Sequence, residues 1–152
     1  MPLTLEIQAF PAAGIIPKEF TCEGADRSPA LTWSGEPEKT KSFALILDDP
    51  DAPGGVWNHW LLWNIPVSTS HLEENLRPHG AILSGKNDFG KSGYGGPCPP
   101  RGHGAHRYYF RLFALDKEKL DLPAGASRAE LDRALAPHIL ATAEYMGRFE
   151  RK

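Results

Sequence analysis

One aspartate, two histidines and one tyrosine are the side chains in this sequence best suited to bind or transform a small molecule. Asp49 follows an apolar segment, and His59 opens another apolar segment. In His106-Arg107-Tyr108, the alternation of a strand puts the imidazole and the phenol on one face and Arg107 on the other. A carboxylate can orient a histidine, and an imidazole and a phenol on one face can both hydrogen-bond an anion.

Each of these residues also has a plainer structural explanation when it is taken alone. Asp49 sits among prolines and glycines, where aspartate is an ordinary turn residue. His59 is explained by a hydrogen bond inside a core, and His103 by a place in a loop. The nearby tryptophans are expected in the core or in a pocket wall: Trp57, Trp60 and Trp63.

The sequence favours binding over catalysis. It has no phosphate-loop motif, no dinucleotide glycine fingerprint and no serine in a nucleophile-elbow context. A metal site drawn from Asp49, His59 and His106 lacks the short ligand spacing that would make it specific, so no metal and no cofactor is expected. The alternative is a hydrolase that uses the aspartate and the histidines as acid and base.

Composition excludes several classes of protein. The 152 residues are enough for one domain with a real core, and 41% hydrophobic and 24% charged residues are typical of globular chains. A net charge of −2 with dispersed basic residues argues against a nucleic-acid partner. No apolar run approaches the roughly 20 residues of a membrane helix, so no membrane insertion is expected. The N-terminal residues do not resemble a signal peptide, which predicts a cytoplasmic location.

Two cysteines, Cys22 and Cys98, both lie in turn-rich segments. They are too few for a disulfide framework or a four-thiolate zinc site. Two reduced thiols in a cytosolic protein and a single bridge are both compatible with the sequence.

Hydrophobic periodicity predicts a chain made mainly of strands. Alternation at residues 3–7 indicates a half-buried strand, and Phe43–Leu47 is apolar on both faces, as in an interior strand. Further strands are expected over 59–65, with His59, Leu61, Trp63 and Ile65 on one face, and over 106–115. Between these two, residues 85–104 form a long loop rich in glycine and proline, and such loops are often functional.

The C-terminal part is predicted to be helical. Ser127 and Glu130 fit a capping box before an apolar stripe. Pro137 should break this helix, and a second helix is expected over 138–146.

Several motifs together resemble the phosphatidylethanolamine-binding protein family, the family of the Raf kinase inhibitor protein, and in particular its compact bacterial and archaeal branch. They span most of the chain in the expected order. The motifs are Phe20-Thr21-Cys22-Glu23-Gly24, Ser28-Pro29-Ala30-Leu31-Thr32-Trp33, Asp48-Asp49-Pro50-Asp51-Ala52-Pro53, His59-Trp60, Asn87-Asp88-Phe89-Gly90, Gly93-Tyr94-Gly95-Gly96-Pro97-Cys98-Pro99-Pro100 and Gly102-His103-Gly104-Ala105-His106-Arg107-Tyr108.

The resemblance implies one domain over residues 1–152: a β-sandwich of two antiparallel sheets with Greek-key connections and short C-terminal helices. It also implies a pocket for phosphate and phosphorylated head groups, in a regulatory or inhibitor module. Residue by residue, the ligand-binding set carried over is Asp49, His59, Pro100, His106 and Tyr108. Kinase inhibition is not carried over, because it depends on surfaces outside these motifs.

In the expected mode of binding, the Tyr108 hydroxyl, an imidazole N–H and backbone N–H groups of the glycine-rich loop surround a phosphate. A histidine that pairs with Asp49 would have a raised pKa and would bind an anion more tightly near pH 6 than near pH 8. The alternative is a module that recognises a phosphorylated protein. The exposed aromatic content suggests a weak homodimer, and the sequence specifies no protein partner.

Overall fold

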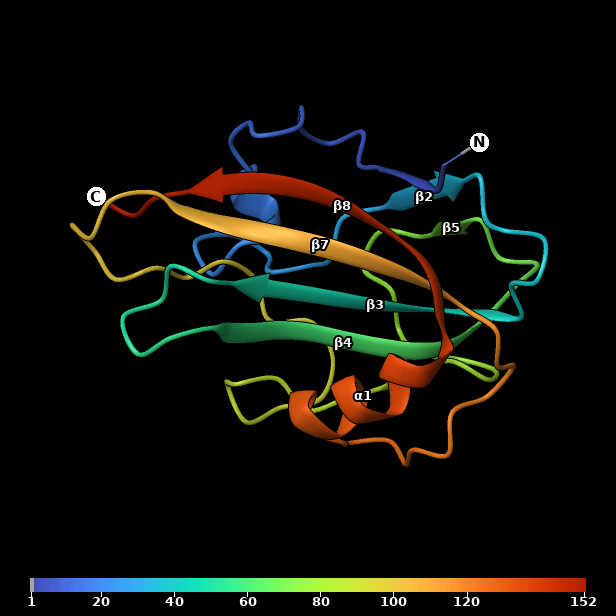
Figure 1. Cartoon of the computed structure of the whole chain (residues 1–152). Helices are drawn as coiled ribbons and strands as arrows, with labels where there is room; N and C mark the ends of the chain where they lie inside the picture. The colour runs from blue at the N-terminus through green and yellow to red at the C-terminus, as the bar shows by residue number, and fades with distance from the viewer. Residues whose placement is uncertain (1) are drawn as a thin grey trace.

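The alternating and the fully apolar segments of the sequence form two antiparallel β-sheets, which pack face to face (Figure 1). The computed structural model describes residues 2–152. The smaller sheet has the order β1 (Thr4–Glu6), β2 (Leu31–Ser34), β5 (His71–Leu72). The larger sheet has the order β6 (Leu83–Ser84), β4 (Trp57–Pro66), β3 (Ser42–Asp49), β7 (His106–Leu115), β8 (Ile139–Phe149). The predicted β-sandwich is therefore confirmed.

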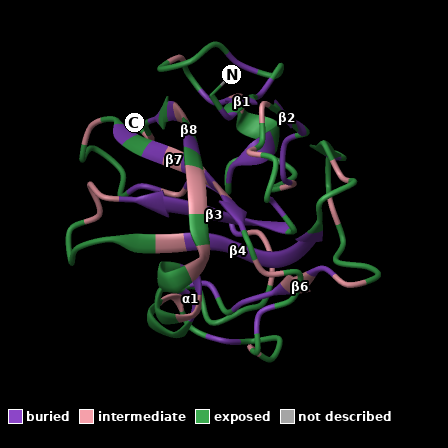
Figure 2. Ribbon diagram, turned by 45° about the vertical axis from the view of Figure 1, so that its right-hand side comes forward, coloured by how far each residue is buried: buried purple, intermediate pink, exposed green. Residues whose placement is uncertain are grey.

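β3 is buried along its whole length, because it is the central strand of the larger sheet and both faces of that sheet are covered (Figure 2). Phe43, Leu45 and Leu47 face the core between the two sheets. Ala44 and Ile46 face the opposite way, into a second apolar cluster. The apolar segment is thus the interior strand that the sequence predicts.

The second cluster lies beneath the helix α1 (Arg128–Leu135). The predicted capping box is present: the Ser127 hydroxyl accepts from the Glu130 backbone N–H, and the Glu130 carboxylate accepts from the Ser127 backbone N–H. The buried side chains of Leu131 and Leu135 hold the helix against the sheet. The short 3-10 helix η2 (Ala136–His138) then ends the helical segment at Pro137.

The predicted second helix over 138–146 is wrong. This segment belongs to β8, which pairs with β7 from His106↔Phe149 to Leu115↔Ile139. Good helix formers such as Leu140, Ala141 and Ala143 gain only tenths of a kcal/mol each from helical propensity. Pairing with β7 satisfies a whole row of backbone groups on a strand that would otherwise be an open edge, and this outweighs the local preference.

The predicted face of β4 is also corrected. Leu61 and Trp63 share the outer face, whereas His59 and Ile65 point toward the inter-sheet side. The cause is two register shifts against β3, one between Leu47 and Asp48 and one between Phe43 and Leu45. Each shift inserts one extra residue into β4, and a single inserted residue reverses the side-chain alternation.

Residues 85–104 form no regular strand, as predicted, but they are anchored to the segment that follows the 3-10 helix η1 (Lys18–Phe20). A disulfide joins Cys22 to Cys98. The Cys22 backbone N–H donates to the Pro97 carbonyl, and the Gly96 N–H donates to the Asp26 carboxylate. The question that the sequence left open is therefore decided in favour of the bridge.

Within residues 2–152, neither α1 nor any other helix is long and apolar enough to cross a membrane.

Candidate functional site

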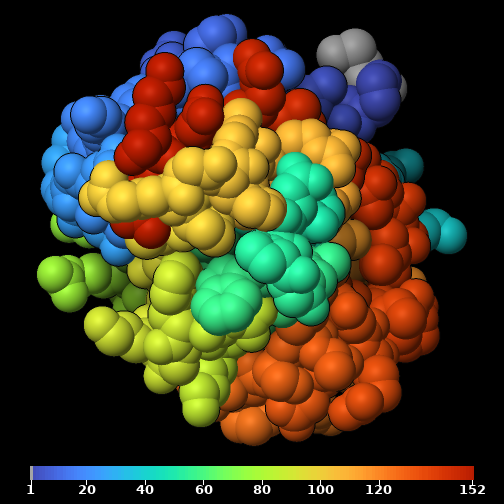
Figure 3. Space-filling model, turned by 90° about the vertical axis from the view of Figure 1, so that its left-hand side faces the viewer, coloured from blue at the N-terminus to red at the C-terminus, as the bar shows by residue number. Residues whose placement is uncertain are grey.

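Two connections between strands meet at one end of the larger sheet and line a cavity of about 210 Å³. They are the β3–β4 connection, in teal in Figure 3, and the long β6–β7 connection, which faces the viewer there in yellow-green and gold. All five residues predicted to bind a ligand line this cavity: Asp49, His59, Pro100, His106 and Tyr108. The remaining lining residues are Ala52, Pro53, Trp57, Phe89, Cys98 and Pro99.

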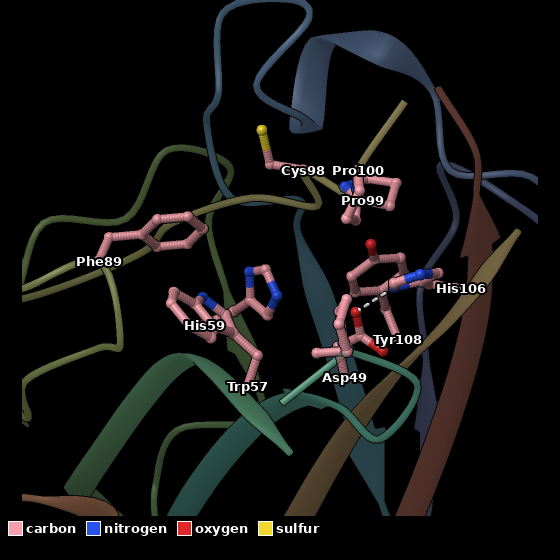
Figure 4. A pocket seen from close by; sticks show the side chains of 11 residues that line it. Asp49, Trp57, His59, Phe89, Cys98, Pro99, Pro100, His106 and Tyr108 are labelled. Atoms are coloured by element: carbon pink, nitrogen blue, oxygen red, sulfur yellow. Dashed lines mark hydrogen bonds and ion pairs between the residues drawn. The ribbon is translucent and has the colours of Figure 1, made fainter. Parts of the chain in front are cut away.

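Asp49 and His106 form a buried pair on one wall of the cavity (Figure 4). The His106 Nδ1 lies 2.7 Å from the Asp49 Oδ2, and both side chains are almost fully buried. The other carboxylate oxygen, Oδ1, accepts from the Asp51 backbone N–H at 2.7 Å. Asp49 therefore holds the imidazole of His106 in one orientation, as the sequence suggested.

His103 is more than a loop residue, which corrects the sequence-based interpretation. Its Nδ1 lies 2.6 Å from the Nε2 of His106. Both ring nitrogens of His106 are therefore engaged, one by Asp49 and one by His103. If the expected imidazole donor were His106, His103 would first have to move away from its Nε2.

His59 stands on the opposite wall of the cavity and has a different hydrogen-bond partner. Its Nδ1 donates to the Gly95 carbonyl at 2.6 Å, which leaves Nε2 as the unprotonated nitrogen of the neutral ring. Burial lowers the pKa of His59 below its usual value, and the Gly95 carbonyl and the Asp49 charge oppose this shift only in part. The rise in pKa is expected for a histidine paired with Asp49, and it does not apply to His59, whose direct partner is a carbonyl and whose ring is desolvated.

Tyr108 lies between the two histidines, with its ring 5.4 Å from that of His59 between centroids. The side chain is fully buried, and its hydroxyl has no hydrogen-bond partner among residues 2–152. Burial, and secondarily the charge of Asp49, raises the pKa of Tyr108 well above its usual value, so the phenol keeps its proton. Figure 4 shows the hydroxyl pointing toward the segment with Pro99 and Pro100.

A charged clamp behind the site fixes the β3–β4 connection. Asp51 accepts from the backbone N–H of Arg107 and from two guanidinium nitrogens, at 2.8–2.9 Å. These bonds lower the pKa of Asp51 to about 2. Arg107 thus points away from the cavity, as strand alternation predicts, and its bond to Asp51 keeps Asp49 in place.

The mouth of the cavity is apolar. Trp57 and Phe89 pack edge to face there, with their ring centroids 5.5 Å apart, and both remain partly exposed. Pro99 and Pro100 form the opposite rim and have no backbone N–H to donate. Gly102 and Gly104 lie outside the lining, so the expected nest of glycine N–H groups does not form the cavity wall.

The same residues do not form a metal site. No group of three or more His, Cys, Asp or Glu side chains within residues 2–152 is arranged to hold a metal ion. His106 has both nitrogens engaged, and the only sulfur in the lining belongs to the disulfide.

The family model for phosphatidylethanolamine-binding protein matches residues 6–150. The chain belongs to this family. A UPF0098 protein of Aquifex aeolicus is 51% identical over 139 residues, which cover 90% of this chain and 81% of that protein.

Two solved members of the phosphatidylethanolamine-binding protein family superpose over nearly the whole length. Escherichia coli YbcL has a TM-score of 0.94 and 35% identity, and covers 100% of both chains. A phosphatidylethanolamine-binding protein homologue from Chlamydia trachomatis has a TM-score of 0.92 and 38% identity, and covers 99% of both chains.

Proposed function

We propose that this member of the phosphatidylethanolamine-binding protein family binds small phosphate-bearing ligands, such as phosphorylated head groups, in the cavity between His59 and His106. The observation that carries the proposal is the buried Tyr108 hydroxyl, which has no partner within residues 2–152. A buried hydroxyl without a partner costs about 1–3 kcal/mol, and an oxyanion oxygen in the cavity would remove that cost. The fold then serves as a binding module, with a regulatory or inhibitory role through its ligand.

The size of the cavity supports a small ligand group. Sites for drug-sized molecules have volumes of roughly 300–1,000 Å³. A cavity of about 210 Å³ fits a phosphoryl group with a short substituent. The apolar mouth at Trp57 and Phe89 would then contact whatever extends outward from that group.

The geometry favours binding over hydrolysis. The lining holds no serine or threonine, and Cys98 is oxidised in the disulfide. The Tyr108 hydroxyl forms no hydrogen bond to a general base among residues 2–152. Asp49, His106 and His103 form a linear hydrogen-bonded chain, but this chain ends on His103 and reaches no nucleophile.

A second candidate is a module that recognises a phosphorylated protein segment. The exposed apolar side chains beside the cavity favour it: Val56, Trp57 and Phe89 are 55%, 38% and 42% exposed. A pull-down that depends on phosphorylation would separate this function from binding of free head groups.

The test of the proposed function is isothermal titration with phosphoethanolamine at pH 6. We expect Tyr108→Phe to weaken binding by about 1–3 kcal/mol, because only the donor to the oxyanion is lost. Tyr109→Phe is the matched control, since Tyr109 is the next residue on β7 and points away from the cavity. Absence of binding by the wild type, or equal losses in both variants, would refute the proposal.

A further inference from the structure

The cavity has an unusual set of polar groups for an anion site. No lysine or arginine lines it, and the one formal charge fixed in its wall is the Asp49 carboxylate. His106 presents no free ring nitrogen, because Asp49 and His103 engage both of them. Among the aspartate, histidine and tyrosine side chains of the lining, the groups left for a ligand are the hydroxyl of Tyr108 and the ring nitrogen Nε2 of His59.

These two groups have opposite hydrogen-bonding roles. The Tyr108 hydroxyl can donate to an oxyanion oxygen. His59 cannot donate in its neutral form, because its single N–H points at the Gly95 carbonyl 2.6 Å away. The Nε2 lone pair therefore needs a donor, and a fully deprotonated phosphate would bring a repelling lone pair to it.

The surroundings keep His59 neutral. The charged and titratable groups around it are Asp49 from β3, Tyr108 from β7 and Asp26 from the segment after η1. The two carboxylates favour protonation, but burial outweighs them and lowers the pKa of His59. Farther out, Asp51 and Arg151 act on Tyr108 with opposite signs, and Asp51 is neutralised by Arg107.

We propose that the site selects a singly protonated, singly charged phosphate monoester: its P–OH donates to the Nε2 of His59 while another oxygen accepts from Tyr108. This inference rests on the proposed function and narrows the ligand class. A dianion would enter a cavity that already holds Asp49 and has no lysine or arginine in its wall. The selected species carries one charge less and supplies the missing donor.

The test compares three small oxyanions by isothermal titration between pH 5.5 and pH 7.5. Methyl phosphate has a P–OH only below its second pKa of about 6, so its apparent affinity should fall about 25-fold over this range. Dimethyl phosphate carries one charge and no P–OH at either pH. Sulfate carries two charges and no proton. Both should bind at least tenfold more weakly than methyl phosphate at pH 5.5. The quantity compared between pH values is the ratio of the methyl phosphate affinity to the dimethyl phosphate affinity, because a change of protonation in the protein that affects both ligands alike leaves this ratio unchanged.

His59→Asn is the variant that isolates the acceptor. The asparagine amide nitrogen can replace Nδ1 as the donor to the Gly95 carbonyl, while the Nε2 lone pair is lost. We expect the preference for methyl over dimethyl phosphate to disappear. The thermal midpoint and far-UV circular dichroism of the variant report whether its fold is retained. If the fold is lost, the pH dependence and the sulfate comparison of the wild type still test the inference.

The outcomes separate this inference from the proposed function. Binding of methyl phosphate that is equally strong at both pH values, or sulfate that matches it at pH 5.5, would overturn the selection of a protonated ligand and leave phosphate binding intact. Retention of the preference in a folded His59→Asn would overturn the role of His59. Absence of methyl phosphate binding at every pH would overturn both proposals.

Discussion

At the scale of single residues, two histidines of similar burial differ in what they offer a ligand, because their hydrogen-bond partners differ. His106 faces a carboxylate on one side and His103 on the other, so it is fully engaged by the protein. His59 bonds to a carbonyl and keeps one nitrogen for the cavity. Their neighbour Tyr108 keeps its proton, because burial disfavours the phenolate.

The clamp between Asp51 and Arg107 makes a prediction about stability and pH. A pKa lowered to about 2 means that the bond stabilises the fold above pH 4, and that this gain is lost as pH falls toward 2. Because the pair is partly exposed, we expect Asp51→Asn to lower the free energy of unfolding by about 1 kcal/mol at pH 7 and by almost nothing at pH 2. Urea unfolding at several pH values measures this difference.

The control for this prediction is Glu74→Gln, which removes a partner from an exposed pair with Arg27. A single exposed pair is worth less than about 1 kcal/mol, so this variant should change stability little. A loss in Asp51→Asn that is the same at both pH values would mean that packing, and not charge, holds the loop.

At the scale of elements, the site depends on two irregular features of otherwise regular strands. The extra residue in β4 beside Leu47 turns His59 from the outer face to the cavity. The segment before β7 contributes the rim, and hydrogen bonds to the segment after η1 hold that rim in place. The strands β3, β4 and β7 carry the polar side chains of the cavity, and the loops supply its rim.

Gly96 is the position where this anchoring is tightest. A side chain there would collide with the Phe20 carbonyl and the Asp26 carboxylate, both of which lie too close for a Cβ atom. We expect Gly96→Ala to destabilise the protein by about 2 kcal/mol and to weaken phosphoethanolamine binding, since the rim must shift. Gly54→Ala is the control, because nothing lies within 4 Å of its added Cβ. Thermal unfolding measures the stability of the two variants, and titration with phosphoethanolamine measures their binding. Equal stability and equal binding of the two variants would contradict the view that the contacts of Gly96 hold the rim in place.

At the scale of the whole molecule, one covalent link ties the N-terminal part to the rim of the cavity. The bridge joins residues 76 positions apart in the sequence, and Cys98 is itself part of the cavity lining. Disulfides persist mainly in oxidising compartments, or in intracellular proteins of hyperthermophiles. The bridge therefore bears directly on the cytoplasmic location predicted from the sequence, which stays a prediction.

Loss of the bridge should be costly. Closing a loop of this length stabilises a fold by about 2–4 kcal/mol, chiefly by restricting the unfolded chain. We expect the double variant Cys22→Ser, Cys98→Ser to lose stability in this range in denaturant unfolding. Alkylation of the wild type without reductant should add no mass to the intact protein. Two alkylated thiols would show that the bridge does not form. A double variant as stable as the wild type would show that the bridge does not contribute to stability.

The sequence by itself determined the strands whose local pattern and tertiary role agree. Phe43–Leu47 is apolar at every position because both faces of β3 are covered, and His106 and Tyr108 share a face because β7 keeps regular alternation. Ser127 and Glu130 predicted the start of α1, because a capping box is a local arrangement. The five predicted ligand residues meet in one cavity because their motifs fall at strand ends.

Only the tertiary structure decided the rest, and the reason is that each missed feature depends on residues distant in sequence. The segment 139–149 is a strand because β7 lies beside it, against its own helical preference. His59 faces the cavity because β4 is shifted against β3. Trp57 and Phe89 are 32 positions apart in the sequence, yet they form the mouth of the cavity together. That both ring nitrogens of His106 have partners follows only from its contacts with Asp49 and His103 in the folded chain. Alternation and motif spacing describe neighbours along the chain, whereas pairing and burial are set by neighbours in space.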